Sequence, residues 1–327
     1  MFRQVLILLS IVSLFASWLI NRKNNNNADN NIGKDKKTMT TVKYTAVPGF
    51  FLHDDEPEGP DFRAHTERDL GLIRRAYETD PKFNQERPNA DSWERFQYFV
   101  EHLNELGQGN ASWKLIYLIR HGEGYHNVKE AEVGRAEWER NWSRVDGDDL
   151  NNWADARLTL KGISQASDLQ HFWSSSDGKI PMPQSVYTSP LARCLETTNC
   201  IYSSVGNGRV YRPIIKEKLR ERFGVHTCDR RSTKTWIGAN YPRYKFERDF
   251  SESDELWKAD QRETEDEVVG RARSLLHDIW QSDKSTYISL TAHSGFIRAL
   301  YTAIGHRQVW VAAGQMMPVF IKAEVIG

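Results

Sequence analysis

The chain has 327 residues, of which 39% are hydrophobic and 11% aromatic, which is enough for a substantial core and excludes a wholly disordered protein. Lys plus Arg (44) balance Asp plus Glu (44), so no overall field draws the chain to nucleic acid or to an acidic surface, and any anion site must be local. The three cysteines, Cys194, Cys200 and Cys228, are an odd number without paired metal spacing. We therefore expect a reducing compartment and no disulfide framework, with a single bridge as the alternative.

Residues 1–22 form a hydrophobic segment that resembles a signal or an anchor. Val5–Ile20 is apolar apart from serines, with Arg3 before it and Arg22 and Lys23 after it. It is slightly shorter than a spanning helix, which needs about 20 apolar residues, and it fits a signal-peptidase site poorly. We therefore favour membrane anchoring through residues 5–20, with a cleaved signal as the alternative. Translation from Met39 would remove the segment, so the predicted localisation is either membrane-anchored or, without residues 1–38, cytoplasmic.

Residues 23–43 are polar and of low complexity, which predicts a disordered linker, and residues 44–327 are predicted to be one folded domain. In that domain, apolar periodicity predicts helices at 91–106, 160–173, 191–201, 263–280 and 296–304. Short apolar runs predict strands at 113–119, within 185–190, and at 210–215, 287–291 and 318–326. This alternation indicates parallel βαβ units, and hence an α/β fold: a three-layer α/β/α sandwich with a mostly parallel central sheet.

Reactive residue types follow the ends of three predicted strands. His121 comes after the strand at 113–119, and His293 comes after the strand at 287–291. The strand within 185–190 ends at a turn that leads to Arg193. Because ligands of such sheets bind beyond the carboxyl ends of the strands, we expect these residues to converge on one crevice.

Two arginines and two histidines at strand ends suit a dianionic phosphate. Arg120 and Arg193 can each donate paired hydrogen bonds to phosphate oxygens. A neutral His121, followed by the flexible Gly122, can attack phosphorus and form a phosphohistidine. His293 can then donate to oxygens on which charge develops. A lone histidine at a strand end is more often structural, so the prediction depends on the combination.

The leaving group needs a proton, and three carboxylates are candidates: Glu123, Glu217 and Glu221. Residue spacing leaves that choice open. The sequence contains no phosphate-binding loop, HExxH or CxxC pattern, so we predict neither a metal nor a cofactor. His226 and Cys228 would make only half of a zinc site.

Two further patterns concern the binding partner. The arginines in LRERFGVHTCDRR (Arg220, Arg222, Arg230 and Arg231) form either a solvated face or a set that contacts the rest of the substrate. The eleven tryptophans show no spaced aromatic platform, so nucleic acid is not an expected partner. The expected partner is a small phosphorylated substrate, and the oligomeric state is not predicted.

Five motifs in order resemble the histidine phosphatase superfamily, also called phosphoglycerate mutase-like, and are most similar to its fungal and plant phosphomutase-like proteins. The motifs are LIRHGEGYHN (118–127), LTLKGISQA (158–166), YTSPLARCLETT (187–198), LRERFG (219–224) and TAHSGFIR (291–298). The resemblance implies that His121 is the phosphorylated nucleophile, that Arg120, Arg193 and His293 form the phosphate pocket, and that Asn127 lines it. It also implies that Glu221 is the proton donor.

Departures from the mutase pattern at Gly124 and His126, together with the HSGFIR run, favour a phosphatase. We therefore predict a cofactor-independent phosphomonoester hydrolase. A phosphomutase is the alternative, and a catalytically weak protein that binds phosphorylated ligands is the third interpretation. Residues 128–153 and 225–256 are expected to cover the pocket.

Overall fold

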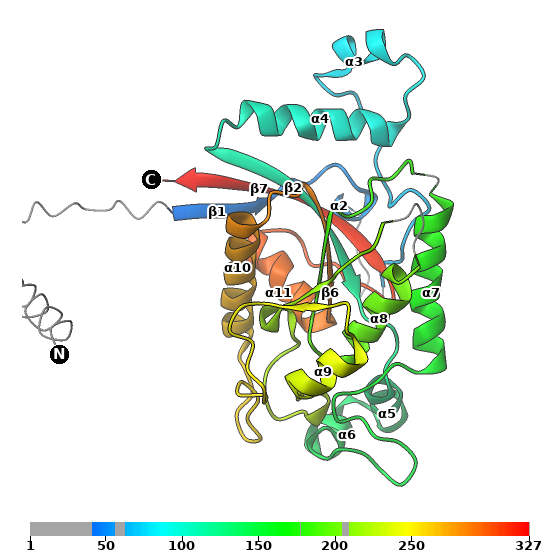
Figure 1. Cartoon of the computed structure of the whole chain (residues 1–327), viewed down its shortest axis with the longest axis vertical. Coiled ribbons are helices and arrows are strands. Elements are labelled where there is room, and N and C mark those ends of the chain that lie inside the picture. Colours follow the sequence, from blue (N-terminus) through cyan, green and yellow to red (C-terminus); the bar gives the residue numbers. More distant parts are fainter. Residues whose placement is uncertain (1–40, 56–62, 177, 205–208, 327) are drawn as a thin grey trace, which may run out of the picture. The chain divides into compact units, whose positions relative to one another are not determined.

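Seven strands among the described residues form one sheet, in the order β1-β7-β2-β6-β3-β4-β5. Figure 1 labels β1, β7, β2 and β6 of this sheet. The computed structural model describes residues 41–55, 63–176, 178–204 and 209–326. β2 pairs in parallel with β6, as do β6 with β3, β3 with β4, and β4 with β5, while β7 is antiparallel to both β1 and β2. The strands are β1 (Thr41–Ala46), β2 (Ala111–Arg120), β3 (Ser185–Thr188), β4 (Ile214–Ile215), β5 (Lys245–Phe246), β6 (Tyr287–Ala292) and β7 (Met316–Ile326).

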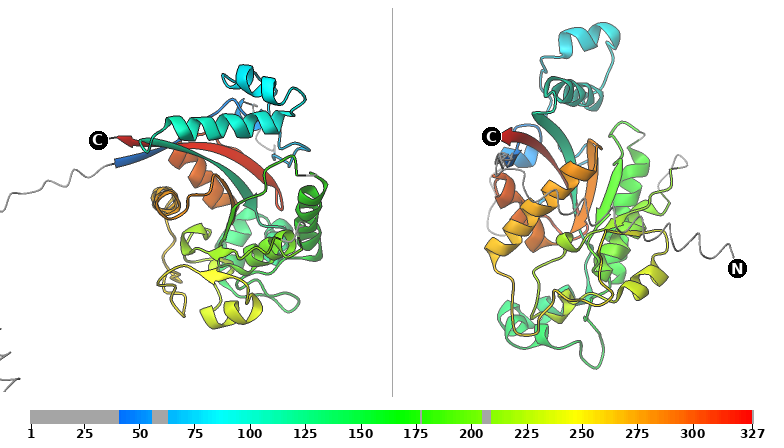
Figure 2. Two further views of the ribbon diagram at one scale, coloured as in Figure 1. Left: turned by 45° about the horizontal axis from the view of Figure 1, so that its top comes forward. Right: turned by 60° about the vertical axis from the view of Figure 1, so that its left-hand side comes forward.

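Helices cover both faces of this sheet, which confirms the predicted three-layer α/β/α sandwich (Figure 2). The α-helices are α2 (Leu52–Asp55), α3 (Asp80–Glu86), α4 (Ser92–Leu106), α5 (Tyr125–Val133), α6 (Arg135–Arg140), α7 (Leu160–Ser175), α8 (Ala192–Tyr202), α9 (Lys234–Asn240), α10 (Glu265–Ser282) and α11 (Ser294–Ile304). Short 3-10 helices lie at Trp142–Arg144, Glu217–Leu219 and Thr227–Asp229.

The central strand β2 shows why two helical layers are needed. Its residues from Leu115 to Ile119 are fully buried, so both of its faces must be covered. Ile116 and Leu118 belong to the hydrophobic cluster that includes α10 and α11. Leu115, Tyr117 and Ile119 belong to the cluster on the other face, with residues of α4, α7 and α8. Side chains alternate between the faces of a strand, so one apolar run supplies both cores.

Local capping signals place the helix starts where the sequence predicts them. The Asp91 side chain accepts hydrogen bonds from the backbone N–H groups of Trp93 and Glu94, and the Glu94 carboxylate accepts one from the backbone N–H of Asp91, which is a capping box at the start of α4. Thr264 and Glu267 form the same arrangement at the start of α10. These reciprocal bonds satisfy backbone N–H groups that would otherwise have no partner.

Three features differ from the sequence prediction. β4 is shorter than the predicted strand at 210–215. β1 begins at Thr41, inside the tract predicted as linker, because it pairs along β7. Helices α5, α6 and α9 occupy segments for which no helix was predicted. Contacts group residues 41–326 into one unit.

The predicted localisation needs a correction. Within residues 41–326, as far as they are described, no helix combines the length and the apolar character needed to cross a bilayer. The predicted anchor at residues 5–20 and most of the predicted linker lie outside the described residues. The prediction of a membrane-anchored or cytoplasmic protein is therefore withdrawn.

Candidate active site

Three parallel strands bring the predicted site residues to one edge of the sheet. In the register of the sheet, Arg120 of β2 lies beside Ala292 of β6. The backbone N–H of His121 donates to the carbonyl of Ala292 at 3.0 Å. The rings of His121 and His293 consequently lie with their centroids 5.0 Å apart. The convergence expected from the strand ends is therefore present.

His121 is held in one orientation and one tautomer. Its Nδ1 lies 2.7 Å from the carbonyl oxygen of Gly122, and because a carbonyl only accepts, Nδ1 carries the hydrogen. Its Nε2 then has a lone pair, which accepts from Nε of Arg193 at 3.3 Å. Burial lowers the pKa of His121 well below its usual value, and the charges of Arg193 and Arg120 act in the same direction. The imidazole is thus neutral, as a nucleophile must be.

Arg193, on the first turn of α8, is fixed by the segment that follows β4. Its Nη1 donates to the carbonyl of Cys228 at 2.6 Å, and its Nη2 donates to Oδ1 of Asp229 at 2.8 Å. Burial by itself would lower the pKa of Arg193, but Asp229 raises it above the ordinary arginine value. The guanidinium is only 1% exposed and stays charged, with N–H groups left over for an anion.

Arg120 ends β2 and has spare hydrogen-bonding capacity. Its Nη1 donates to the carbonyl of Val311 at 3.0 Å, whereas its buried Nε has no partner among the described residues. Burial lowers the pKa of Arg120 and Glu221 opposes that effect, but an arginine remains charged at physiological pH. A free buried donor beside His121 is what an anion pocket requires.

His293 and Asn127 lie at the starts of two helices. His293 is the N-cap residue of α11, and its Nε2 is 2.9 Å from Oγ of Ser189 and 3.3 Å from Sγ of Cys194. Burial lowers its pKa well below the usual value, followed by the charge of Arg193. Asn127 accepts a hydrogen bond from the N–H of Gly124 at 3.1 Å, so its side chain helps to cap α5. A phosphate-binding role for Asn127 stays a prediction.

The three candidate carboxylates have different surroundings. Oε2 of Glu221 accepts from the N–H of Gly295 in the first turn of α11, at 2.9 Å, which puts this carboxylate beside His293. Glu123 instead binds Thr159 Oγ1 and Lys161 Nζ. Glu217 forms ion pairs with Arg220 and Arg231. Of the three, Glu221 is thus the carboxylate that the fold holds at the N-terminus of α11, where His293 is the N-cap residue.

Glycines explain why the motifs come together. A Cβ on Gly122 would overlap the carbonyl of Gly162 in α7, and a Cβ on Gly162 would overlap the backbone of Glu123. A Cβ on Gly295 would overlap the carboxylate of Glu221. These close approaches let α7 pack on the turn after His121 and let Glu221 reach the N-terminus of α11.

The two segments expected to cover the pocket contact each other. Thr227 Oγ1 donates to the carbonyl of Val145 at 2.7 Å, and His226 Nε2 lies 2.9 Å from Oε2 of Glu139. Trp138, Trp153 and Cys228 share one small hydrophobic cluster. Since Asp229 of the second segment binds Arg193, this joint substructure adjoins the pocket.

The arginine cluster in this region is mostly internal. Arg220 and Arg231 are buried and pair with Glu217 and, for Arg220, also with Asp254. Arg222 donates to the carbonyl of Glu263. The solvated-face interpretation therefore fails for Arg220 and Arg231, which tie the segment together.

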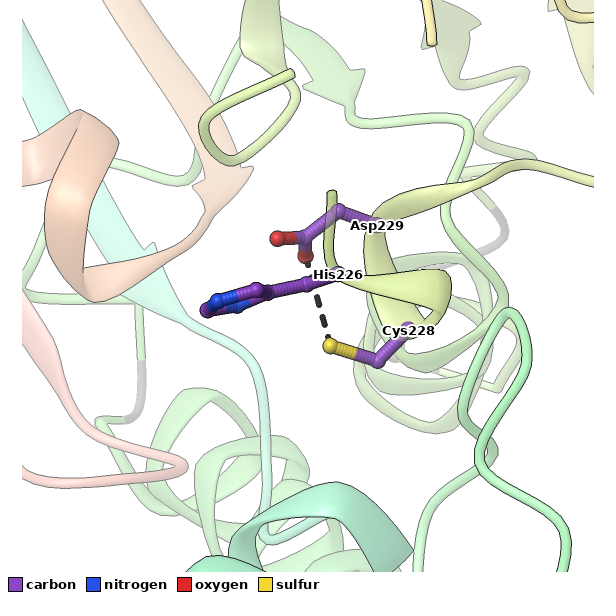
Figure 3. A group of neighbouring side chains, drawn as sticks. All are labelled: His226, Cys228 and Asp229. Carbon is purple, nitrogen blue, oxygen red and sulfur yellow. Dashed lines mark hydrogen bonds between the residues drawn. The ribbon is translucent and has the colours of Figure 1, made fainter. Parts of the chain in front are cut away.

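His226, Cys228 and Asp229 form a cluster whose candidate ligand atoms lie within 4.8 Å of one another (Figure 3). Both carboxylate oxygens of Asp229 already accept hydrogen bonds, Oδ1 from Arg193 and Oδ2 from Arg262 at 2.9 Å. Although burial opposes it, Arg262 and Arg193 hold the pKa of Asp229 below its usual range. A cation here would have to displace two guanidinium groups, so the cluster fits support of Arg193 better than metal binding.

Sequence reasoning missed Asp229 and gave His126 no role. Asp229 stands among the arginines of LRERFGVHTCDRR, where its charge was the available signal. In the sequence, His126 stands out only as a departure from the mutase motif. Its ring centroid lies 5.5 Å from that of His121.

Comparisons with known proteins show which family the chain resembles. The profile of the histidine phosphatase superfamily (branch 1) matches residues 116–312. A protein of Arthroderma benhamiae named "Probable phosphoglycerate mutase" is 41% identical over 293 residues, covering 89% of this chain and 87% of its own. Phosphomutase-like protein 3 of Candida albicans is 38% identical over 212 residues, covering 64% of this chain and 66% of its own.

A plant relative and a solved structure extend the comparison. Phosphoglycerate mutase-like protein 1 of Arabidopsis thaliana is 32% identical over 208 residues, covering 56% of this chain and 69% of its own. The crystal structure of phosphoglycerate mutase from Bacillus anthracis aligns with a TM-score of 0.43 and 16% identity, over 67% of this chain and 95% of that one. The profile match and the first relative show that the chain belongs to the histidine phosphatase superfamily.

Proposed function

We propose that the protein is a phosphomonoester hydrolase that works through a phosphohistidine at His121. The observation that carries the proposal is the tautomer of His121: Nδ1 donates to the Gly122 carbonyl, and Nε2 presents its lone pair beside Arg193. A neutral, oriented imidazole next to a buried guanidinium is suited to attack an anionic phosphoryl group.

In the first step, the Nε2 lone pair forms a bond to phosphorus while the bond from phosphorus to the ester oxygen breaks. Arg120 and Arg193 offset the charge on the transferred group, and His293 donates to an oxygen on which charge increases. Glu221 gives its proton to the leaving oxygen, so the alcohol departs neutral. The position of Glu221 at the N-terminus of α11, beside His293, supports this assignment.

In the second step, a water molecule attacks the phosphohistidine. Glu221, now a carboxylate, takes a proton from that water, the bond from phosphorus to Nε2 breaks, and inorganic phosphate leaves. The enzyme returns to its starting state without a cofactor. The proposed substrate is a small phosphorylated molecule.

A phosphomutase is the second candidate, and the names of the fungal and plant relatives favour it. It shares the first step but retains the product and returns the phosphoryl group to it. A protein that binds phosphorylated ligands without turnover is disfavoured, because the sequence retains His121, Glu221 and His293 at all the predicted catalytic positions.

A phosphate-release screen over sugar, nucleotide and inositol phosphates tests the proposal. Full-length protein should release phosphate from at least one ester, and His121→Ala should abolish that release. His171→Ala, which removes an exposed histidine of α7, should retain it. If the protein interconverts phosphoglycerates but releases phosphate from no ester, the hydrolase proposal is wrong and the protein is a phosphomutase.

A further inference from the structure

His126 is a buried side chain that the mechanism above does not use. It is the second residue of α5, it is 8% exposed, and its ring lies beside that of His121. Its Nδ1 is buried and has no hydrogen-bond partner in the described part of the chain. A buried polar group without a partner destabilises a fold, so its persistence calls for an explanation.

The charged groups that face His126 indicate which partner would suit it. Arg193 and Arg120, the two arginines of the proposed phosphate pocket, both act electrostatically on this imidazole, as do His121 and His226. None of these four groups is an anion. A phosphoryl group in the pocket would place its oxygens among the same residues, and an imidazole N–H is a good donor to such an oxygen.

The protonation state of His126 is also consistent with an anionic partner. Burial lowers the pKa of His126 well below its usual value, and Arg193, His121 and Arg120 add to that effect. The ring is therefore neutral in the free protein and has one N–H to donate. An arriving dianion would offset the positive charge of the two arginines.

Gly124 is what lets the ring lie where it does. A Cβ on Gly124 would be 2.8 Å from Nδ1 and 2.9 Å from Cε1 of His126, which is closer than real contacts allow. The φ angle of Gly124 is −106°, which any residue can adopt, so a substitution there does not strain the backbone conformation. The group that must move is the end of the His126 side chain. The carbonyl of Arg157, at 3.2 Å, is a second close contact.

We propose that His126 donates a hydrogen bond to an oxygen of the bound phosphoryl group, as an additional ligand of the phosphate pocket, and that Gly124 keeps the space in which its imidazole lies. The proposal rests on the proposed function and deepens it, because it concerns the same site. It makes His126 a substrate-binding residue and Gly124 a positioning residue.

The competing explanation is that the His126 ring only fills space between α5 and its neighbours. The two explanations differ in what His126→Phe does, because phenylalanine keeps an aromatic ring and loses both nitrogens. A purely structural ring predicts a change in the melting temperature with unchanged anion binding. If His126 instead donates to the bound phosphate, His126→Phe should bind anions more weakly.

The test measures the affinity of the full-length protein for inorganic phosphate and for orthovanadate by titration calorimetry at neutral pH. His126→Phe should weaken both affinities about tenfold or more, as expected for the loss of one hydrogen bond to a charged group. His126→Gln, which keeps a donor, should recover part of the affinity. Gly124→Ala should weaken binding to a similar extent, because it displaces the same ring.

A double variant tests whether the two positions act through one group. If Gly124 acts only through His126, the variant carrying both Gly124→Ala and His126→Phe should bind no more weakly than His126→Phe alone. Gly270→Ala, at a helical glycine with open space around it, is the matched control and should leave the affinity unchanged. If His126→Phe does not fold, the phosphate affinities of His126→Gln and Gly124→Ala decide the question. The proposal expects both to bind more weakly than the wild type, and wild-type affinity in both would overturn it.

The outcomes separate this proposal from the proposed function. Wild-type affinity in His126→Phe would overturn the role of His126, and losses from the two sites that multiply in the double variant would overturn the positioning role of Gly124. Both outcomes leave the hydrolase standing. A wild-type protein that neither binds phosphate or orthovanadate nor releases phosphate from esters would overturn both proposals.

Discussion

Asp229 and Arg193 form a buried ion pair behind the proposed nucleophile. Nη2 of Arg193 donates to Oδ1 of Asp229 at 2.8 Å, with the two side chains 1% and 4% exposed. Arg193 in turn donates from Nε to His121. Asp229 thereby holds in place the guanidinium that contacts the proposed nucleophile, although Asp229 and His121 are far apart in the sequence.

The first prediction concerns this pair. Asp229→Asn leaves Arg193 buried without its counter-charge, so the free energy of unfolding should fall by about 3 kcal/mol. We expect kcat/KM for an accepted ester to fall about tenfold or more because Arg193 loses its orientation. Urea unfolding and steady-state kinetics measure the two effects. Asp146→Asn, which breaks the exposed pair with Arg230, is the control and should cost less than about 1 kcal/mol. An Asp229→Asn protein with unchanged kinetics would contradict the positioning role.

The second prediction concerns the proton donor. Glu221→Gln should reduce turnover of alkyl phosphates far more than turnover of nitrophenyl phosphate, whose leaving group needs little protonation. We expect the ratio of the two kcat values to change at least about tenfold. Equal losses on both substrates would remove Glu221 from the acid role.

The third prediction follows from the contact of Gly295 with Glu221. Since a Cβ at position 295 would overlap the carboxylate, Gly295→Ala should push Glu221 away from the N-terminus of α11. The variant should show the same leaving-group dependence as Glu221→Gln. Gly270→Ala again serves as control. If Gly295→Ala reduced the turnover of both substrates equally, the substitution would have shifted the whole pocket and not Glu221 alone, which would contradict the prediction.

The fourth prediction concerns stability against pH. Burial lowers the pKa of His53 to about 4, against an opposing effect of Asp54. In the unfolded chain a histidine has a pKa of about 6.5. Between these values the unfolded state binds the proton and the folded state does not, so the free energy of unfolding falls as pH falls, by up to about 3 kcal/mol from this group.

His53→Gln isolates this effect. The His53 Nε2–H donates to the carbonyl of Pro318 at 2.9 Å, and glutamine also supplies a donor. Denaturant unfolding at steps from pH 7 to pH 4 should give a steeper decline for the wild type than for the variant. Parallel curves would show that His53 does not titrate in this range.

Much of the fold could be predicted because its signals are local. The capping residues of α4 and the buried run of β2 are written in consecutive residues. The antiparallel direction of β7 carries no such signal, because it is decided by pairing with β1 and β2, hundreds of residues away in the chain. The short helices α5 and α6 lack a long apolar period, and they are stabilised by contacts with the segment around His226.

The site was partly predictable for a similar reason. His121, His293 and Arg193 follow strand ends, and parallel strands bring their ends together. The carboxylate could not be chosen by spacing, because the contact that holds Glu221 at the start of α11 is with Gly295, which is 74 residues away in the sequence. The link from Arg193 to Asp229 spans 36 residues and has no motif of its own. The Glu221–Gly295 contact and the Arg193–Asp229 contact both depend on the packing of the segment that follows β4.

The most direct test of the central claim is to trap the phosphoenzyme. Full-length protein is mixed with an accepted phosphomonoester, quenched within milliseconds, digested and analysed by mass spectrometry. We predict one acid-labile phosphoryl group on the peptide that contains His121, absent from His121→Ala and longer-lived in Glu221→Gln. Rapid phosphate release by the wild type with no phosphorylated His121 at any time point, and with His121→Ala still active, would contradict the account.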